Sequence, residues 1–215
     1  LNSDSWEEGL MACAQEKFPR YMQFRSQVLN RFRQYEVPII DLKKENTKEA
    51  VCLVFEKVNT GGVSLSVFEL ITAAYAAEGF NLRDDWYGSQ ERQVPSRQQQ
   101  FVSRPLLRDI EPTDFLQGVS LLHTYAQREQ DLAAGRTAKE ITAVSAKREQ
   151  VLALPLIAYR NWADKLVEGF KKADAFLKME GFRQSDFLPY RTQLIPLAAV
   201  MAHLGDRWLE PAIYN

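Results

Sequence analysis

The stretch that decides the fold is FEKVNTGGVSLSVFEL, residues 55–70. Its first residues continue an apolar helical pattern, and Asn59-Thr60-Gly61-Gly62 ends that helix, because glycine takes a positive φ angle without steric cost. Ser66-Val67-Phe68-Glu69 follows as a capping box, in which a Ser hydroxyl and a Glu carboxylate satisfy amide groups at the start of a helix. The stretch therefore predicts two helices that meet at a tight corner.

This corner has two interpretations. It is either a purely structural bend or a cradle for an anion, in which main-chain amides of residues 60–64 point into one concavity near the positive end of the next helix. Spacing alone favours the structural bend. In the second interpretation an amide side chain hydrogen-bonds a phosphate or a base and a lysine adds charge, so the candidate phosphate-binding residues are Asn59, Gly61, Gly62 and Lys57.

Upstream of the corner, the chain shows a basic helix and one strand candidate. Tyr21, Phe24, Val28 and Phe32 recur at helical spacing, and arginines occupy the other faces of that helix. These arginines either contact phosphates or form a solvated face, which is the commoner role. Residues 37–42, VPIIDL, are short and β-branched and predict an edge strand. Its partner strands must come from outside this sequence, from another subunit or from a weaker segment.

Downstream of the corner, the sequence predicts a linker and then a helical bundle. Residues 81–104 are rich in loop formers and glutamine, and we place a domain boundary there, between a domain at 1–85 and a helical domain at 86–215. Helices are predicted from Phe115 to about Ala134, up to Leu154, from Pro155 to about Gly181, and from Leu188 onward, where Pro196 must kink or delay the last one. The predicted fold is mainly α.

Composition excludes several classes of protein. The chain has 215 residues, 46% hydrophobic content and a net charge of −1, which is typical of a globular protein and offers no bulk electrostatic case for tight DNA binding. The longest apolar run, residues 194–204, is too short to span a bilayer. Cys13 and Cys52 lack metal-ligand spacing and are expected to be free thiols in a reduced cytoplasm.

Complete catalytic motifs are missing from the sequence. The two histidines, His123 and His203, are far apart and each lies in an apolar helical run, so we interpret them as core or boundary residues. The carboxylates are scattered, and Asp84-Asp85 is interpreted as part of a turn. We therefore assign no catalytic residue and no metal ligand.

The motifs do resemble a known family. Phe55-Glu56-Lys57-Val58-Asn59, with Gly61-Gly62 and Leu65-Ser66 after it, is similar to the signature of the N-terminal domain of GmrSD restriction endonucleases. Further similar segments follow in the family's order: Pro105-Leu106-Leu107-Arg108-Asp109, Asp114-Phe115-Leu116-Gln117, Trp162-Ala163-Asp164 and Leu188-Pro189-Tyr190-Arg191-Thr192-Gln193-Leu194. The likeness extends over most of the chain, from Trp6 to Leu204.

The resemblance implies a ParB/sulfiredoxin-like domain that handles nucleotides, joined to a helical region, in a bacterial restriction or anti-phage protein. It implies a nucleoside triphosphate with Mg²⁺ as cofactor of the full-length protein, DNA as a partner and an associated nuclease domain. The family's upstream Asp-Gly-Gln-Gln-Arg motif and its HNH domain are both missing here. We therefore expect an internal piece of a longer protein, inactive alone, in which the corner at Asn59 forms part of a nucleotide pocket.

An alternative interpretation requires no site chemistry. A dense helical core and balanced charge also suit a protein-interaction or scaffolding module that binds a partner segment or forms a homodimer through an apolar face.

Overall fold

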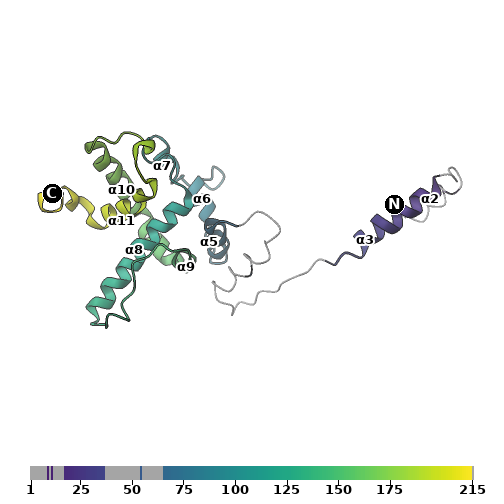
Figure 1. The fold of residues 1–215 in the computed structure, drawn as a ribbon, viewed down its shortest axis with the longest axis horizontal. Coiled ribbons are helices and arrows are strands. Elements are labelled where there is room, and N and C mark those ends of the chain that lie inside the picture. Colours follow the sequence, from purple (N-terminus) through teal and green to yellow (C-terminus); the bar gives the residue numbers. More distant parts are fainter. Residues whose placement is uncertain (1–8, 10, 12–16, 37–53, 55–64, 215) are drawn as a thin grey trace. The chain divides into compact units, whose positions relative to one another are not determined.

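The computed structural model describes residues 9, 11, 17–36, 54 and 65–214. The chain divides into two units, Leu1–Lys44 and Glu45–Asn215 (Figure 1). The predicted strand at 37–42, both cysteines and the corner at 57–62 lie outside the described residues.

The first unit contains the predicted basic helix. It runs without a break through α2 (Phe18–Phe24), a π-helical turn (Arg25–Leu29) and α3 (Asn30–Arg33). Pro19 lies in its first turn, where the missing amide costs no hydrogen bond. In the π turn the amide of Asn30 donates to the carbonyl of Arg25, so one extra residue is accommodated within the helix.

The second unit is helical over the residues that the structure describes, which confirms the mainly α prediction for this part of the chain. A single isolated β-bridge joins Ser89 and Val94 there. The α-helices are α5 (Val67–Ala76), α6 (Leu82–Tyr87), α7 (Gln99–Val102), α8 (Pro112–Ala133), α9 (Arg148–Leu152), α10 (Leu156–Met179), α11 (Leu194–Leu204) and α12 (Pro211–Tyr214). Short 3-10 turns cover Ser185–Phe187, Arg191–Gln193 and Gly205–Leu209.

Local sequence signals set most of these helix ends. Gly181 follows α10 with φ of +87°, as its position predicts. Pro196 lies in the first turn of α11, so it delays the helix and does not kink it. The predicted start of α8 at Phe115 is wrong: the helix begins at Pro112, because Glu111 and Asp114 form the capping box.

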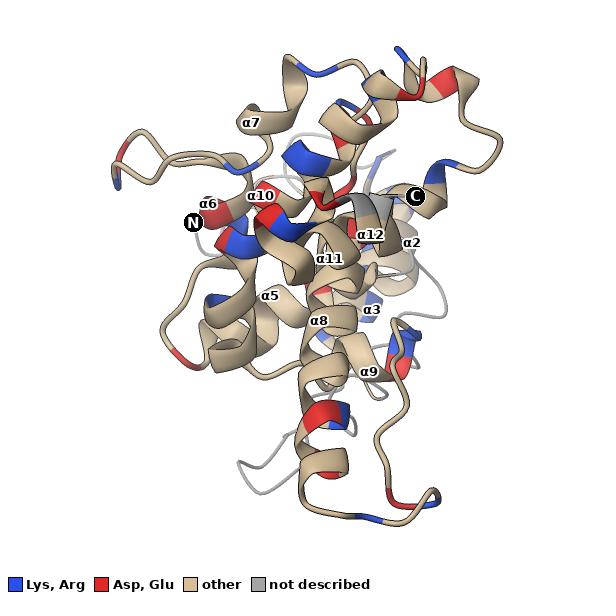
Figure 2. Ribbon diagram, turned by 90° about the vertical axis from the view of Figure 1, so that its left-hand side faces the viewer, with Lys and Arg blue, Asp and Glu red and all other residues tan. Residues whose placement is uncertain are grey.

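The core of the second unit is built on α8, α10 and α11, with α5 to α7 and α9 around them. Aromatic side chains fill its centre at ring distances of 5.1 to 6.4 Å. These rings belong to Trp86, Phe101, Phe115, Tyr159 and Phe170, each at most 1% exposed. Figure 2 shows charged segments distributed over this unit, whereas α11 has no Lys, Arg, Asp or Glu.

The segment at 81–104 is not the loop that its composition predicts. It forms α6, a turn bridged between Ser89 and Val94, and α7. Leu82, Trp86 and Phe101 are buried in the same core as α8 and α10, because three large apolar side chains at wide spacing suffice to anchor a polar segment. The assignment of residues 1–85 to a ParB-like domain stays a prediction.

Two glycines let the long helices approach closely. A Cβ atom on Gly169 of α10 would lie 2.2 Å from the carbonyl oxygen of Ala198 in α11. A Cβ atom on Gly118 of α8 would lie 2.7 Å from Cδ2 of Leu166 in α10. Within the described residues, no helix combines the length and the apolar character needed to cross a membrane.

Candidate functional site

The phosphate site predicted from the sequence lies outside the described residues. It consists of Lys57, Asn59, Gly61 and Gly62. The structure does describe α5, the helix that follows the corner. Its start confirms the predicted capping box: Ser66 Oγ accepts from the amide of Glu69 at 3.3 Å, and Glu69 Oε2 accepts from the amide of Ser66 at 2.7 Å.

This cap decides which groups at the corner remain for an anion. The amide of Ser66 is already used, and the carboxylate of Glu69 faces the start of the helix. A negative side chain there offsets the positive end of the helix dipole and repels a phosphate. An anion at the corner would therefore depend on the loop amides before Leu65 and on Lys57, and not on the end of α5.

The exit from the corner is fixed to the core by α5. Phe68, Leu70, Ile71 and Tyr75 of this helix are buried. The hydroxyl of Tyr75 also donates to the carbonyl of Leu154 at 3.1 Å, across 79 residues of sequence. The helix that directly follows the corner in the sequence is therefore firmly anchored in the core.

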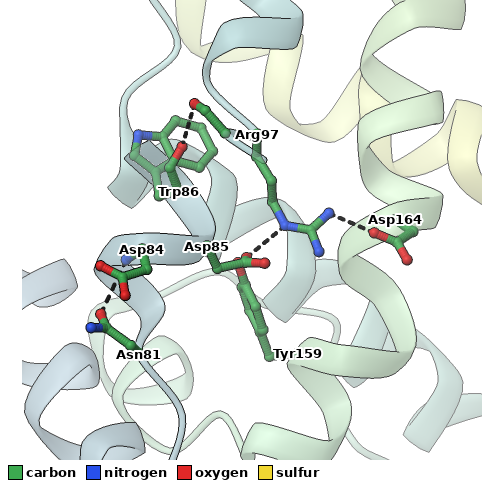
Figure 3. Close-up of polar contacts among 8 residues, drawn as sticks. Asn81, Asp84, Asp85, Trp86, Arg97, Tyr159 and Asp164 are labelled. Carbon is green, nitrogen blue, oxygen red and sulfur yellow. Dashed lines mark hydrogen bonds and ion pairs between the residues drawn. The ribbon is translucent and has the colours of Figure 1, made fainter. Parts of the chain in front are cut away.

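A second group of polar residues, absent from the predictions, lies between α6 and α10 (Figure 3). Asp85 Oδ2 accepts from the hydroxyl of Tyr159 at 2.5 Å and from Nε of Arg97 at 2.6 Å. Arg97 Nη1 also donates to Asp164 Oδ1 at 2.6 Å. We call Asp85, Arg97, Tyr159 and Asp164 the Arg97 cluster.

Local hydrogen bonds place Asp85 in this cluster. Asn81 Oδ1 accepts from the amide of Asp84 and so caps α6. The hydroxyl of Ser96 donates to the carbonyl of Trp86 at 2.9 Å, and the amide of Arg97 donates to the carbonyl of Asp85 at 3.3 Å. These bonds return the chain after the turn at 88–96 alongside α6, so that the Arg97 side chain reaches Asp85.

The electrostatics of the Arg97 cluster follow from burial and charge. Burial, with the negative charge of Asp85 beside it, raises the pKa of the Tyr159 hydroxyl well above its ordinary value. Burial alone would lower the pKa of Arg97, but the hydrogen bonds to Asp85 and Asp164 outweigh it and raise that pKa. At neutral pH Tyr159 is therefore a neutral donor and Arg97 a cation.

The Arg97 cluster is a structural connection. Nε and Nη1 of Arg97 each pair with a carboxylate of the same chain, so these two donors are not directed at a phosphate. A tyrosine whose pKa is raised cannot serve as a base at neutral pH. The cluster ties α6 and the segment after it to α10.

An apolar groove lies on another face of the second unit, between α8, α11 and the loop at 134–147. It has a volume of about 220 Å³, and its walls are apolar apart from Tyr125 and His203, whose rings meet edge to face at 4.7 Å. Val144 and Val200 on its walls are 44% and 52% exposed. The other histidine, His123, is partly buried, which lowers its pKa.

The loop beside the groove is held against α8 by buried polar groups. Asp131 is buried and accepts from both the amide and the hydroxyl of Thr142, and it pairs with Arg136 at 2.6 Å. The hydroxyl of Ser120 donates to the carbonyl of Ser145 at 3.0 Å, and Thr124 Oγ1 accepts from the amide of Ser145 at 3.1 Å. The wall that carries Val144 is therefore well fixed.

Sequence reasoning could not find the Arg97 cluster. Its members come from segments interpreted as linker and from an apolar helical stripe, and Tyr159 is separated from Asp85 by 74 residues. The acidic pair Asp84-Asp85 was the only local signal, and it equally suits a turn.

Comparison of the chain with protein-family models, with curated proteins and with solved structures found no match. Membership of the GmrSD N-terminal family thus stays a prediction. Among the described residues, no group of three or more His, Cys, Asp and Glu side chains is placed to hold a metal ion.

Proposed function

We propose that this chain is part of a bacterial nucleotide-dependent DNA restriction or anti-phage protein. In this proposal the corner contributes Asn59, Gly61, Gly62 and Lys57 to a nucleotide or phosphate pocket of the full-length protein. The observation that supports it is the start of α5: Leu65-Ser66, the last residues of the motif, lead into a capping box, where the sequence predicts a new helix.

The groups that the capping box does not use determine how the corner would bind a phosphate. Since Glu69 occupies the amide of Ser66, the N-cap of α5, phosphate oxygens would be bound by amides between Thr60 and Ser64. Adjacent glycines allow the main chain to come close to such a ligand. Lys57 would supply a point charge and Asn59 a directed amide.

The test is the substitution Asn59→Ala in the full-length protein. We expect nucleoside triphosphate hydrolysis with Mg²⁺ to be abolished, while the melting temperature stays within a few degrees. The matched control is Asn81→Ala, which removes an asparagine that caps α6. This control should lose about 1 kcal/mol of stability and keep its hydrolysis rate. Unchanged hydrolysis in the Asn59 variant would contradict the proposal.

The alternative function, a protein-interaction module, is favoured by the apolar groove of about 220 Å³. Its occupant would be a second copy of the chain, because α11 has no charged residue and the net charge of −1 offers little repulsion between copies. Under this alternative, Val200→Glu in the groove wall should convert a dimer to a monomer in sedimentation experiments. A parent chain that is monomeric at high concentration would exclude it.

A further inference from the structure

We infer that the helix formed by α2, the π turn and α3 binds a single strand of nucleic acid. The inference concerns residues 17–36, so it does not depend on the nucleotide pocket proposed at Asn59.

The first observation is charge. From Lys17 to Tyr35 the chain has five basic residues and no acidic one, although the whole chain carries a net charge of −1. Among the residues that the structure describes, no carboxylate lies within ion-pair distance of Arg20, Arg31 or Arg33. Guanidinium groups without protein partners suit phosphate oxygens, which they bind in a bidentate geometry.

The second observation is exposed aromatic surface. Phe24 is 50% exposed, Phe32 is 79% exposed and Tyr35 is 71% exposed. Phe32 lies directly between Arg31 and Arg33. A single exposed apolar side chain is ordinary, but several exposed rings on one short helix indicate an interaction surface.

The π turn places two of these rings in one line. Residues eight apart in a regular α-helix are separated by about 80° around the axis. The extra residue of a π turn removes about 100° of this rotation, which brings Phe24 and Phe32 to within about 20° of each other. The two rings then lie about 12 Å apart along the helix.

Aligned rings flanked by arginines match an unpaired strand better than the other partners of a basic helix. The faces of unpaired bases are open and stack on aromatic side chains, while the arginines follow the phosphates. Bases in a duplex are already stacked on one another. A membrane-bound helix gathers its charged residues on one face opposite the apolar one, whereas here Arg31 and Arg33 lie about 100° to either side of the exposed Phe32 ring around the helix axis.

The experiment measures binding of the full chain to a labelled oligothymidine of about 20 nucleotides, at low salt and without nucleoside triphosphate. One variant pair is Arg31→Ala with Arg33→Ala, and the other is Phe24→Ala with Phe32→Ala. All four positions are solvent-exposed on a helix that alanine favours, so folding is retained. The charge-matched control is Lys139→Ala with Arg183→Ala, two exposed cations of the second unit.

We expect each pair to weaken binding roughly tenfold or more, and the control to bind like the parent. The arginine pair should also lower the magnitude of the salt slope by about 1.4, from about 0.7 for each lost phosphate contact, while the phenylalanine pair should leave it unchanged. A duplex of the same length should bind more weakly than the single strand.

Three results would overturn the inference: no binding by the parent, equal loss in the control, or binding only to phosphatidylserine vesicles. Failure here is distinguishable from failure of the nucleotide pocket, because Asn59→Ala should leave oligothymidine binding intact.

Discussion

Replacing Gly169 by alanine tests the packing of α10 against α11. The new Cβ atom would lie 2.2 Å from the carbonyl oxygen of Ala198 and 2.7 Å from Cβ of Ala202, against an ordinary contact of at least 3.4 Å. The carbonyl oxygen belongs to a helix backbone, so no rotamer change can relieve the clash. The two helices must separate, in a core where every neighbour is closely packed.

The magnitude follows from two opposing effects. Overpacking of this kind costs about 1–3 kcal/mol, and a backbone clash belongs at the upper end. Alanine in place of glycine inside a helix returns about 1 kcal/mol. We expect a net loss of about 2 kcal/mol, or a decrease of about 4–8 °C in melting temperature for a chain of this size.

Gly118→Ala is the matched control. Its new Cβ atom would meet only the side chain of Leu166, at 2.7 Å from Cδ2, and although Leu166 is buried a side chain shifts at lower cost than a helix carbonyl. The packing cost and the helix gain should then nearly cancel, to within about 1 kcal/mol. Urea unfolding followed by circular dichroism measures both variants. If Gly169→Ala is as stable as the parent, or costs no more than Gly118→Ala, the reasoning about this interface is refuted.

Two further predictions concern buried polar groups. Arg97→Ala should lower the free energy of unfolding by about 2 kcal/mol, because the side chain of Asp85, 18% exposed, then has no cation beside it. The side chain of Asp164 is 86% exposed, so Asp164→Asn should lower it by less than about 0.5 kcal/mol. Equal losses in urea unfolding would show that the Asp164 pair, and not the Asp85 pair, stabilises this cluster. Burial raises the pKa of Tyr75 above its ordinary value of 10.0, so the unfolded chain releases this proton first and stability should fall as the pH rises above about 10. The Tyr75→Phe variant has no hydroxyl to titrate at this position, so the stability advantage of the parent over the variant should become smaller between pH 8 and pH 11. An advantage that stays constant over this range would exclude the titration of Tyr75.

Local signals predicted the helical architecture. The capping box at Ser66, the glycine at 181 and the proline at 196 each act within a few residues of the helix end that they define. Such signals are readable because their partners lie nearby in the sequence.

The segment at 81–104 shows where local sequence signals are insufficient. Its polar composition predicts a linker, yet Leu82, Trp86 and Phe101 anchor it in the core. Three scattered apolar residues become buried only if helices α8 and α10 pack against them, and these helices are distant in the sequence. The same holds for Tyr159 and Asp85, whose hydrogen bond no local pattern could reveal.

The candidate site is divided in the same way. The capping box at Ser66 predicted the start of α5, which the structure confirms, while the corner at Asn59 lies outside the described residues. The opposing carboxylate of Glu69 was present in the sequence as half of a capping box. Its effect on an anion depends on its hydrogen bond to the amide of Ser66, which only the structure shows.

The position of α11 affects how the chain folds during its synthesis on the ribosome. α5 is synthesised before α11, and the core cluster that contains its Phe68, Ile71 and Tyr75 is complete only when Leu194 and Ala198 of α11 have been added. At about 5–20 residues per second, the nascent chain waits roughly ten seconds between these events. α10 is complete only at Met179, so the apolar sides of α8 and α10 lack this cover from then until α11 has followed, and apolar surface exposed in that period favours chaperone binding.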